Sequence, residues 1–253
     1  MKIQYQSDLH FEFGINRALF NKHKYRKVYG DVLVIAGDLD YLTSDGIYRK
    51  YTLDYLNWAG DNFERVLVVP GNHEYWGENP FDLEHAQTPF QIDISSNVSV
   101  GSNVVIEHNG VKFALSTLWS HIALGIQQYL NSNERRWVRL NGNPPTLDDA
   151  NRIHQKCVDF LSNVEADIVV THHAPTYKSM HPAYTISKDN EQFYNNLEKL
   201  IFKIEPKAWI FGHAHFTNRE ALKVFEPIKI VSNPLGYTWE ENTGYKRDAI
   251  LEI

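Results

Sequence analysis

The sequence predicts an α/β fold in one domain spanning residues 1–253. Short apolar runs alternate with segments of helical periodicity, and a polar block follows each of five strand candidates. Continuous apolar runs are typical of strands buried on both faces, which helices connect in parallel. No linker-like composition and no internal repeat interrupts the 253 residues, so we expect a single domain.

The strand candidates differ in pattern along the chain. Lys2–Gln6 alternates weakly between polar and apolar residues, whereas the later candidates are almost wholly apolar. These later candidates are Val32–Ala36, Val66–Val69, Ile168–Val170 and Trp209–Phe211. We expect the later four to be buried on both faces, as in a sheet that is covered by helices.

Three segments between the strands have helical spacing of their apolar residues. Ser44–Phe63 opens with a residue suited to an N-cap, and Leu147–Val164 and Asn190–Ile204 show the same periodicity. Val104–His108 and Val111–Leu118 flank Asn109-Gly110, which predicts a hairpin with a type I′ turn. Ser120–Pro145 is polar and ends in a Gly-Asn-Pro-Pro breaker, so we interpret 120–145 as a partly helical excursion that could serve as a lid.

Composition and charge narrow the classes of function. The net charge is 25 − 31 = −6, with no basic block, so nucleic acid is expected only as a substrate. The chain has no apolar run long enough for a membrane span, and its N-terminus turns polar at once. Cys157 has no cysteine to pair with. We therefore expect a cytoplasmic protein without a membrane partner.

Metal-ligand residue types follow the strand candidates at five places. In chain order these are Asp8 and His10, then Asp38, then Asn72, His73 and Glu74, then His172 and His173, and finally His213 and His215. Because the carboxyl ends of parallel strands open into one crevice, these side chains can converge. Oxygen and imidazole donors without cysteine indicate a site for hard or borderline metal ions.

Five short motifs follow one another along the chain: Asp8-x-His10, Gly37-Asp38, Gly71-Asn72-His73-Glu74, Thr171-His172 and Gly212-His213-x-His215. In this order they resemble the signature motifs of the calcineurin-like metallophosphoesterase superfamily. The opening segment, Thr117-Leu118-Trp119 and Asn233–Tyr237 further resemble a bacterial and phage group of phosphoesterases. This resemblance implies a four-layer α/β sandwich, in which two mixed sheets pack face to face with helices outside.

The resemblance also implies a ligand set for two divalent ions. One ion would be held by Asp8, His10 and His215 and the other by Asn72, His172 and His213, with Asp38 bridging. Manganese is the expected metal, with iron, zinc, nickel or cobalt as alternatives. Two divalent ions and two aspartates leave 4 − 2 = +2, which favours a phosphate oxygen and a hydroxide nucleophile attacking in line.

His73 is the second candidate catalytic residue beside Asp38, because the resemblance places it as an acid near the leaving oxygen. Glu74 either orients the His73 ring or is simply an acid at a helix start. His173 is expected to pack beside the site or to bond to a carbonyl there. Asp40 is expected to be solvated.

Aromatic residues beyond the polar blocks are candidates for the substrate wall. We expect Tyr75, Trp76, Trp119, His121 and Tyr177 near the metals, where rings could stack a base or could merely pack the core. His121 stands where the resembling group commonly has an acid. Arg135, Arg136 and Arg139 are expected on a solvated helix face, with a phosphate clamp as the alternative.

The sequence thus predicts a binuclear phosphoester hydrolase acting on a phosphodiester or nucleotide. A phosphomonoesterase or Ser/Thr protein phosphatase is the alternative within the enzyme class. A metal-binding scaffold without activity is the alternative outside it, although every expected ligand position is filled here.

Overall fold

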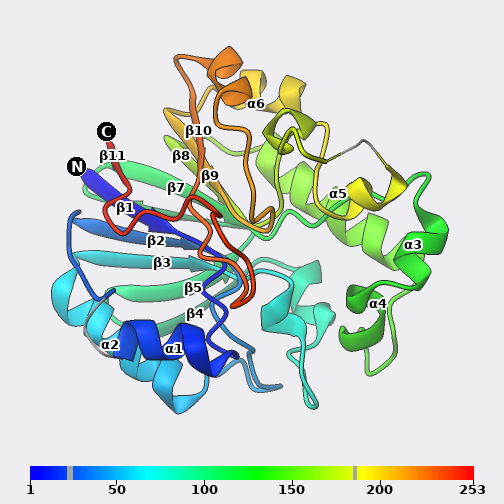
Figure 1. Ribbon diagram of the computed structural model, residues 1–253, viewed down its shortest axis with the longest axis horizontal. Coiled ribbons are helices and arrows are strands. Elements are labelled where there is room, and N and C mark those ends of the chain that lie inside the picture. Colours follow the sequence, from blue (N-terminus) through cyan, green and yellow to red (C-terminus); the bar gives the residue numbers. More distant parts are fainter. Residues whose placement is uncertain (22–24, 185–186) are drawn as a thin grey trace.

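The computed structural model describes residues 1–21, 25–184 and 187–253, and it contains two mixed β-sheets. The six-stranded sheet has the order β11-β1-β2-β3-β5-β4 and the five-stranded sheet the order β10-β9-β8-β7-β6. Figure 1 shows α1 and α2 beside the first sheet and α5 and α6 beside the second, with the sheets between them. The four-layer α/β sandwich is therefore confirmed.

The strands of the first sheet are β1 (Lys2–Gln6), β2 (Val32–Ala36), β3 (Arg65–Val69), β4 (Phe90–Ser95), β5 (Val98–Ser102) and β11 (Ile250–Glu252). Those of the second are β6 (Val104–His108), β7 (Val111–Ser116), β8 (Ile168–Thr171), β9 (Ala208–Phe211) and β10 (Lys229–Ser232). Parallel pairing joins β1, β2, β3 and β5, and likewise β7 to β10. All five predicted strands and the predicted hairpin are present, and positive φ angles at Asn109 (50°) and Gly110 (76°) fit the type I′ turn.

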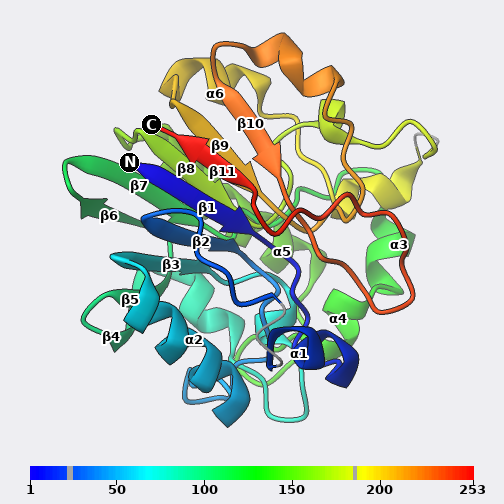
Figure 2. The same ribbon diagram turned by 60° about the vertical axis from the view of Figure 1, so that its left-hand side comes forward.

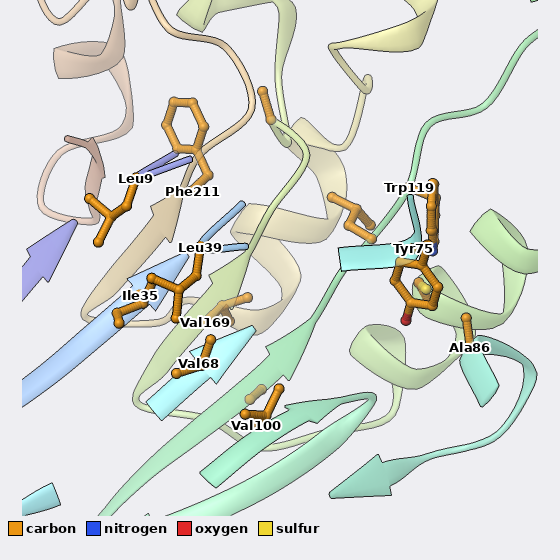
Figure 3. Close-up of a cluster of buried hydrophobic side chains, with 14 of the residues drawn as sticks. Leu9, Ile35, Leu39, Val68, Tyr75, Ala86, Val100, Trp119, Val169 and Phe211 are labelled. Atoms are coloured by element: carbon orange, nitrogen blue, oxygen red, sulfur yellow. The ribbon is translucent and has the colours of Figure 1, made fainter. Parts of the chain in front are cut away.

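The apolar runs are continuous because the two faces of each strand belong to different cores. In β2, Val32 and Val34 pack into the core between the sheets, whereas Leu33 and Ile35 face the core beneath the helices. Successive side chains of a strand point to opposite faces, so both faces must be apolar. Figure 3 shows the second of these cores, which reaches from Leu9 and Ile35 to Trp119.

The longer helices are α1 (Gly14–Asn21), α2 (Lys50–Asn62), α5 (Leu147–Ser162) and α6 (Glu198–Ile204). A capping box at Thr146 and Asp149 fixes the start of α5, as the sequence predicts for residue 147. Within the described ranges, the 3-10 helices are His73–Tyr75, Leu83–Gln87, Tyr177–Ser179, Lys188–Gln192 and Ala221–Phe225.

Two predicted helices begin later than the sequence periodicity suggests. The segment before α2 forms a turn closed by hydrogen bonds between Thr43 and Ile47, with Gly46 at φ 72°. Before α6, the chain runs beside 174–176 and forms bridges at Tyr194 and Asn196. Tertiary hydrogen bonds outweigh helical propensity in both segments.

The 120–145 segment contains two short helices, α3 (Ile126–Leu130) and α4 (Asn133–Trp137), which lie at the right-hand edge of Figure 1. Ser132 caps α4 by accepting a hydrogen bond from the backbone N–H of Arg135. Arg136 is exposed over Trp137, and Arg139 donates to the carbonyls of Arg136 and Val138. Whether the segment moves as a lid stays a prediction.

The ends of the described chain meet at one edge of the first sheet. The N-terminal strand pairs antiparallel with β11, and the Met1 amino group donates to the Ile253 carbonyl at 3.1 Å. Figure 2 shows β1 and β10 ending near the middle of the molecule, where the C-terminal chain crosses on its way to β11. In the described residues, no helix combines the length and the apolar character that crossing a membrane requires.

Candidate metal centre

The polar blocks converge at the carboxyl ends of the parallel strands. Among the described residues, ligand-type atoms form three groups, each within 4.8 Å of one another, and together the groups use seven residues. The groups are Asp8, His10 and His215; His10, Asp38 and His73; and Asp38, His172 and His213. The three groups share His10 and Asp38, so they form one continuous cluster.

The backbone reaches this arrangement through sharp turns after the strands. Asp8, His10, Asp38 and His213 all adopt positive φ, between 48° and 64°. Such values are uncommon for residues with a Cβ and are concentrated at functional sites. A Cβ at Gly37 would overlap the His172 ring, so glycine is required there for the ring to reach Asp38.

Histidine nitrogens face one another at the centre of the cluster. His10 Nε2 lies 3.2 Å from His215 Nε2, and His215 Nε2 lies 3.4 Å from Asp8 Oδ1. His172 Nε2 lies 2.9 Å from Asn72 Oδ1 and 3.3 Å from Asp38 Oδ1. The Asn72 amide donates to Glu134 Oε1 at 3.0 Å, which turns its carbonyl oxygen toward His172.

The outer nitrogens of the same rings are held by fixed acceptors. His10 Nδ1 bonds to Glu12 at 2.8 Å, His172 Nδ1 to the Ala36 carbonyl at 2.9 Å, and His215 Nδ1 to Glu240 at 2.6 Å. This pattern, in which an acceptor holds one nitrogen and frees the other, is the usual environment of metal-binding histidines. The residues present therefore fit divalent ions.

The electrostatics of the cluster depend on burial and on close acid–base pairs. Burial lowers the pKa of His172, but Asp38 outweighs it and raises that pKa to about 9. Burial also lowers the pKa of His215, but the neighbouring Asp8 and Glu240 outweigh this effect and raise that pKa to about 10. Burial and then His172 lower the pKa of His213 to about 3, so its ring is neutral.

His73 lies between the cluster and an aromatic partner. Its Nδ1 bonds to Glu12 Oε1 at 2.7 Å and its Nε2 lies 3.2 Å from the Tyr237 hydroxyl. The ring stacks on Trp76 with centroids 3.8 Å apart. Burial lowers the pKa of His73, but Asp38 and Glu12 raise it above its ordinary value.

Glu12 and the C-terminal pair Tyr237 and Glu240 were not assigned roles from the sequence. Glu12 Oε1 contacts both His10 and His73, and Tyr237 lies over His10 and His215, with ring centroids 4.5 and 4.6 Å apart. The spacing Asp8-x-His10-x-Glu12 was a usable signal for Glu12, because it places an acid two residues beyond a ligand. Tyr237 and Glu240 follow the weakly apolar strand β10, which carries no comparable signal.

Glu74 contacts the backbone of two loops. Its carboxylate accepts from the N–H groups of Asp38 at 3.0 Å, Leu39 at 2.8 Å and Gly71 at 2.7 Å, and from the Tyr48 hydroxyl at 3.1 Å. Burial and then Asp38 raise the pKa of Glu74 to about 8. Glu74 therefore joins the loops after β2 and β3, and it is Glu12 that contacts the His73 ring.

We expect Glu74→Gln to destabilise the protein, because an amide nitrogen would face backbone N–H groups and leave a buried donor unpaired. The free energy of unfolding should fall by about 2–3 kcal/mol. Urea unfolding above pH 8, where the Glu74 carboxylate is ionised, measures this loss, with Glu64→Gln as an exposed control. An unchanged midpoint for Glu74→Gln would contradict the role of Glu74 in joining the loops.

The other predicted residues lie at different depths. His173 is buried against His213, with centroids 4.2 Å apart, and its Nδ1 lies 3.3 Å from the Thr117 carbonyl. Tyr75 and Trp119 pack together in the core, as Figure 3 shows. His121 and Tyr177 line a separate depression with His154, away from the cluster residues.

Asp40 corrects the expectation of a solvated side chain. It is fully buried, and its carboxylate pairs with Arg49 and accepts from Thr52 and from the Tyr41 backbone. The start of α2 brings Arg49 and Thr52 over Asp40, and a buried carboxylate requires such partners. This proximity arises from packing and leaves no sequence signal.

Comparison with known proteins agrees with the geometry. The family model of the calcineurin-like phosphoesterases matches residues 1–216. Uncharacterized protein L509 of Acanthamoeba polyphaga mimivirus is 27% identical over 268 residues, which cover 95% of this chain and 92% of that protein. Phosphopantetheinyl hydrolase (PptH) from Mycobacterium tuberculosis is 17% identical with a TM-score of 0.62, covering 93% of this chain and 89% of that chain, and shows a shared fold.

The family match includes all five polar blocks and so confirms the resemblance found in the sequence. The buried groups of aspartate and histidine that could hold metal ions lie within the same matched range. The chain therefore belongs to the calcineurin-like phosphoesterase family and is a metallophosphoesterase hydrolase.

Proposed function

We propose that the protein is a two-metal phosphodiesterase acting on small phosphodiesters. The proposal rests mainly on three histidines whose Nε2 atoms face the centre of the cluster. Their Nδ1 atoms are held by hydrogen bonds to Glu12, to the Ala36 carbonyl and to Glu240. One ion would be held by Asp8, His10 and His215. The other ion would be held by Asn72, His172 and His213, and Asp38 would be a ligand to both ions. When bound, two divalent ions would neutralise the phosphoryl oxygens and make water a nucleophile near neutral pH.

The charge around the cluster favours a diester over a monoester. Besides Asp8 and Asp38, the carboxylates of Glu12 and Glu240 lie against ligand histidines. Two divalent ions and these four carboxylates sum to 4 − 4 = 0, and a protonated His73 brings the sum to +1, rather than the +3 that the aspartates alone would leave with the same histidine. Because a diester carries one negative charge and a monoester up to two, a cluster of this lower charge suits the diester.

His73 is suited to move the proton that the leaving oxygen requires. Glu12 holds Nδ1, so Nε2 is the atom that faces the cluster and the Tyr237 hydroxyl. Asp38 Oδ2 lies 3.9 Å from this Nε2. A protonated His73 can therefore donate from Nε2 to an oxygen beside the ions, as general acid catalysis requires.

The first test is hydrolysis of bis-p-nitrophenyl phosphate and p-nitrophenyl phosphate by chelator-stripped protein with Mn²⁺ restored. We expect no activity without metal and a preference for the diester with it. A preference for the monoester would favour the phosphomonoesterase or protein phosphatase alternative. Failure to hydrolyse either ester, despite two bound ions, would favour the scaffold alternative.

The identity of the metal as manganese and the cytoplasmic location of the protein stay predictions.

We expect metal binding to release protons. Since His172 and His215 have pKa values of about 9 and 10 without metal, both carry a proton at pH 8. Histidine binds metals in its neutral form, so these two ligands should release about two protons per chain as both ions bind, in addition to any proton lost by metal-bound water. The release should shrink as the pH rises through 9 and 10. Calorimetric titration in two buffers of different ionisation enthalpy measures it, and no release at pH 8 would contradict the assignment of these two ligands.

We expect Glu12→Gln to slow hydrolysis while leaving the fold intact. Glutamine keeps one carbonyl oxygen but has no negative charge, so its hydrogen bonds to His10 Nδ1 and His73 Nδ1 are weaker. Both rings are then held less firmly in their orientations. Loss of such a partner typically costs 10- to 100-fold in metal affinity or activity. Steady-state kinetics and metal titration measure the effect, with Glu64→Gln as the control. A kcat and a metal affinity equal to those of the wild type would contradict this role.

A further inference from the structure

Two depressions lie beside the metal cluster and share part of their lining, including His213. One has a cavity volume of about 380 Å³ and contains Asp38, His213 and His215 in its lining, and the other has a volume of about 450 Å³ and contains Asn72 and His213. Both are bordered by Phe193 and Tyr237. A phosphodiester centred on the cluster would therefore place one substituent in each depression.

The first depression has an aromatic wall, formed by Tyr184, Phe193, Tyr194, Phe216 and Tyr237. Phe193 stacks on His213 with centroids 4.9 Å apart and planes at 24°, yet 38% of the residue is exposed. Tyr184 packs edge-on against Phe216 and is 45% exposed. Exposed rings beside a site are a stacking surface for a flat group, a contact that every heterocycle or arene can make.

The second depression is lined largely by side-chain amides. They come from Asn72, from Gln127, Gln128, Asn131 and Asn133 of the 120–145 segment, and from Gln192. Amides both donate and accept hydrogen bonds and carry no charge. This depression therefore suits a polar, uncharged substituent.

The charges of the residues lining the two depressions disfavour a second phosphate. Among the described residues that line them, the carboxyl side chains are Asp38 and Glu240 in one and Glu134 and Asp189 in the other, and none of the lining residues is lysine or arginine. The arginines of α4 do not line either depression. Without a cation to neutralise it, an additional phosphate would face like charge.

We propose that the aromatic-walled depression binds a flat, uncharged substituent of a phosphodiester whose only charge lies at the scissile phosphate. This inference rests on the proposed function and adds the substrate class: a diester of a single nucleoside or comparable ring compound, rather than a polynucleotide or nucleoside polyphosphate. The amide-lined depression takes the second, polar substituent.

The test compares two esters with the same charge and the same leaving group, thymidine 5′-(p-nitrophenyl phosphate) and ethyl p-nitrophenyl phosphate, with Mn²⁺-loaded protein. We expect the thymidine ester to have a kcat/KM at least about tenfold higher, since stacking one base is a contact of that strength. Tyr184→Ala should remove most of this difference, and Tyr184→Phe should restore it. Phe216→Leu, which keeps an apolar side chain without a ring, should act like Tyr184→Ala. Phe202→Ala, an exposed ring lining a different groove, is the control.

A third substrate tests the charge, namely the same thymidine ester carrying a 3′-phosphate. We expect its kcat/KM to be lower than that of the unphosphorylated ester at low ionic strength. A higher kcat/KM would overturn the singly charged substrate class, and unchanged ester preference in both Tyr184→Ala and Phe216→Leu would overturn the aromatic subsite. If the loaded wild type hydrolyses no diester at all, the proposed function fails and this inference with it.

Discussion

Asp38→Asn should abolish hydrolysis of phosphodiesters, lowering kcat/KM by roughly 10³-fold or more. Asp38 belongs to two of the three ligand groups, and its Oδ1 and Oδ2 point to different histidines, His172 at 3.3 Å and His10 at 3.8 Å. An amide offers one oxygen in place of two and removes a charge, so it cannot serve two cations together. The expected loss is about 4 kcal/mol or more of transition-state stabilisation.

Two measurements on Asp38→Asn separate loss of metal from loss of fold. Metal content after dialysis should fall below two ions per chain, whereas the far-UV circular dichroism spectrum should stay that of the wild type. Asp45→Asn, an exposed aspartate on the turn before α2, is the matched control and should retain both ions and full activity. Full activity of Asp38→Asn would contradict a shared ligand at this position.

His73→Ala should retain both metal ions and lose about 10²- to 10⁴-fold in kcat, the range that positioned acid groups contribute. The loss should be larger for alkyl leaving groups than for p-nitrophenolate, which departs without a proton. The reason is geometric, because Nε2 of His73 faces the cluster while Glu12 holds Nδ1. His73 is not needed to complete either proposed ligand set, so metal content should be unaffected.

The leaving-group dependence is the decisive measurement for His73. A plot of log kcat against the pKa of the leaving phenol or alcohol should be steeper for His73→Ala than for the wild type. His121→Ala serves as the control, because His121 is exposed and lines a depression apart from the cluster. Equal slopes for His73→Ala and the wild type would contradict the acid role and favour a purely electrostatic one.

The fold was predictable because burial on both faces leaves a clear sequence pattern. Runs such as Val32–Ala36 are apolar throughout since they contribute to two cores at once, and the turn at Asn109-Gly110 carries its own backbone preference. The weak elements were missed for the converse reason. Strand β4 alternates half-buried and exposed residues, β5 is buried but contains serine and glycine, and β10 and β11 are edge strands with mixed burial. Short edge strands are specified by their partners rather than by their own composition.

The convergence of the polar blocks was also predictable, because parallel strands bring their carboxyl ends to one crevice. Asp8, Asp38 and His213 each follow a strand, and the topology alone places them near one another. The aromatic residues expected beside the metals lie in different places, since Trp76 stacks on His73, whereas Tyr75 is fully buried in the core and Tyr177 lines another depression. The number of residues between an aromatic side chain and a metal-ligand residue does not indicate whether the ring points into the site or into the core.

By itself, the sequence determined the α/β class, the position of a polar block after each of five strands and the type of donor atom available to a metal ion. The tertiary structure alone decided that Glu12 serves two histidines, that Glu240 holds His215, and that Tyr237 lines both depressions. The physical reason is that strand and turn patterns arise from local periodicity and backbone preference. A contact between residues more than 20 positions apart depends on how finished elements pack, and it leaves no periodic trace in the chain.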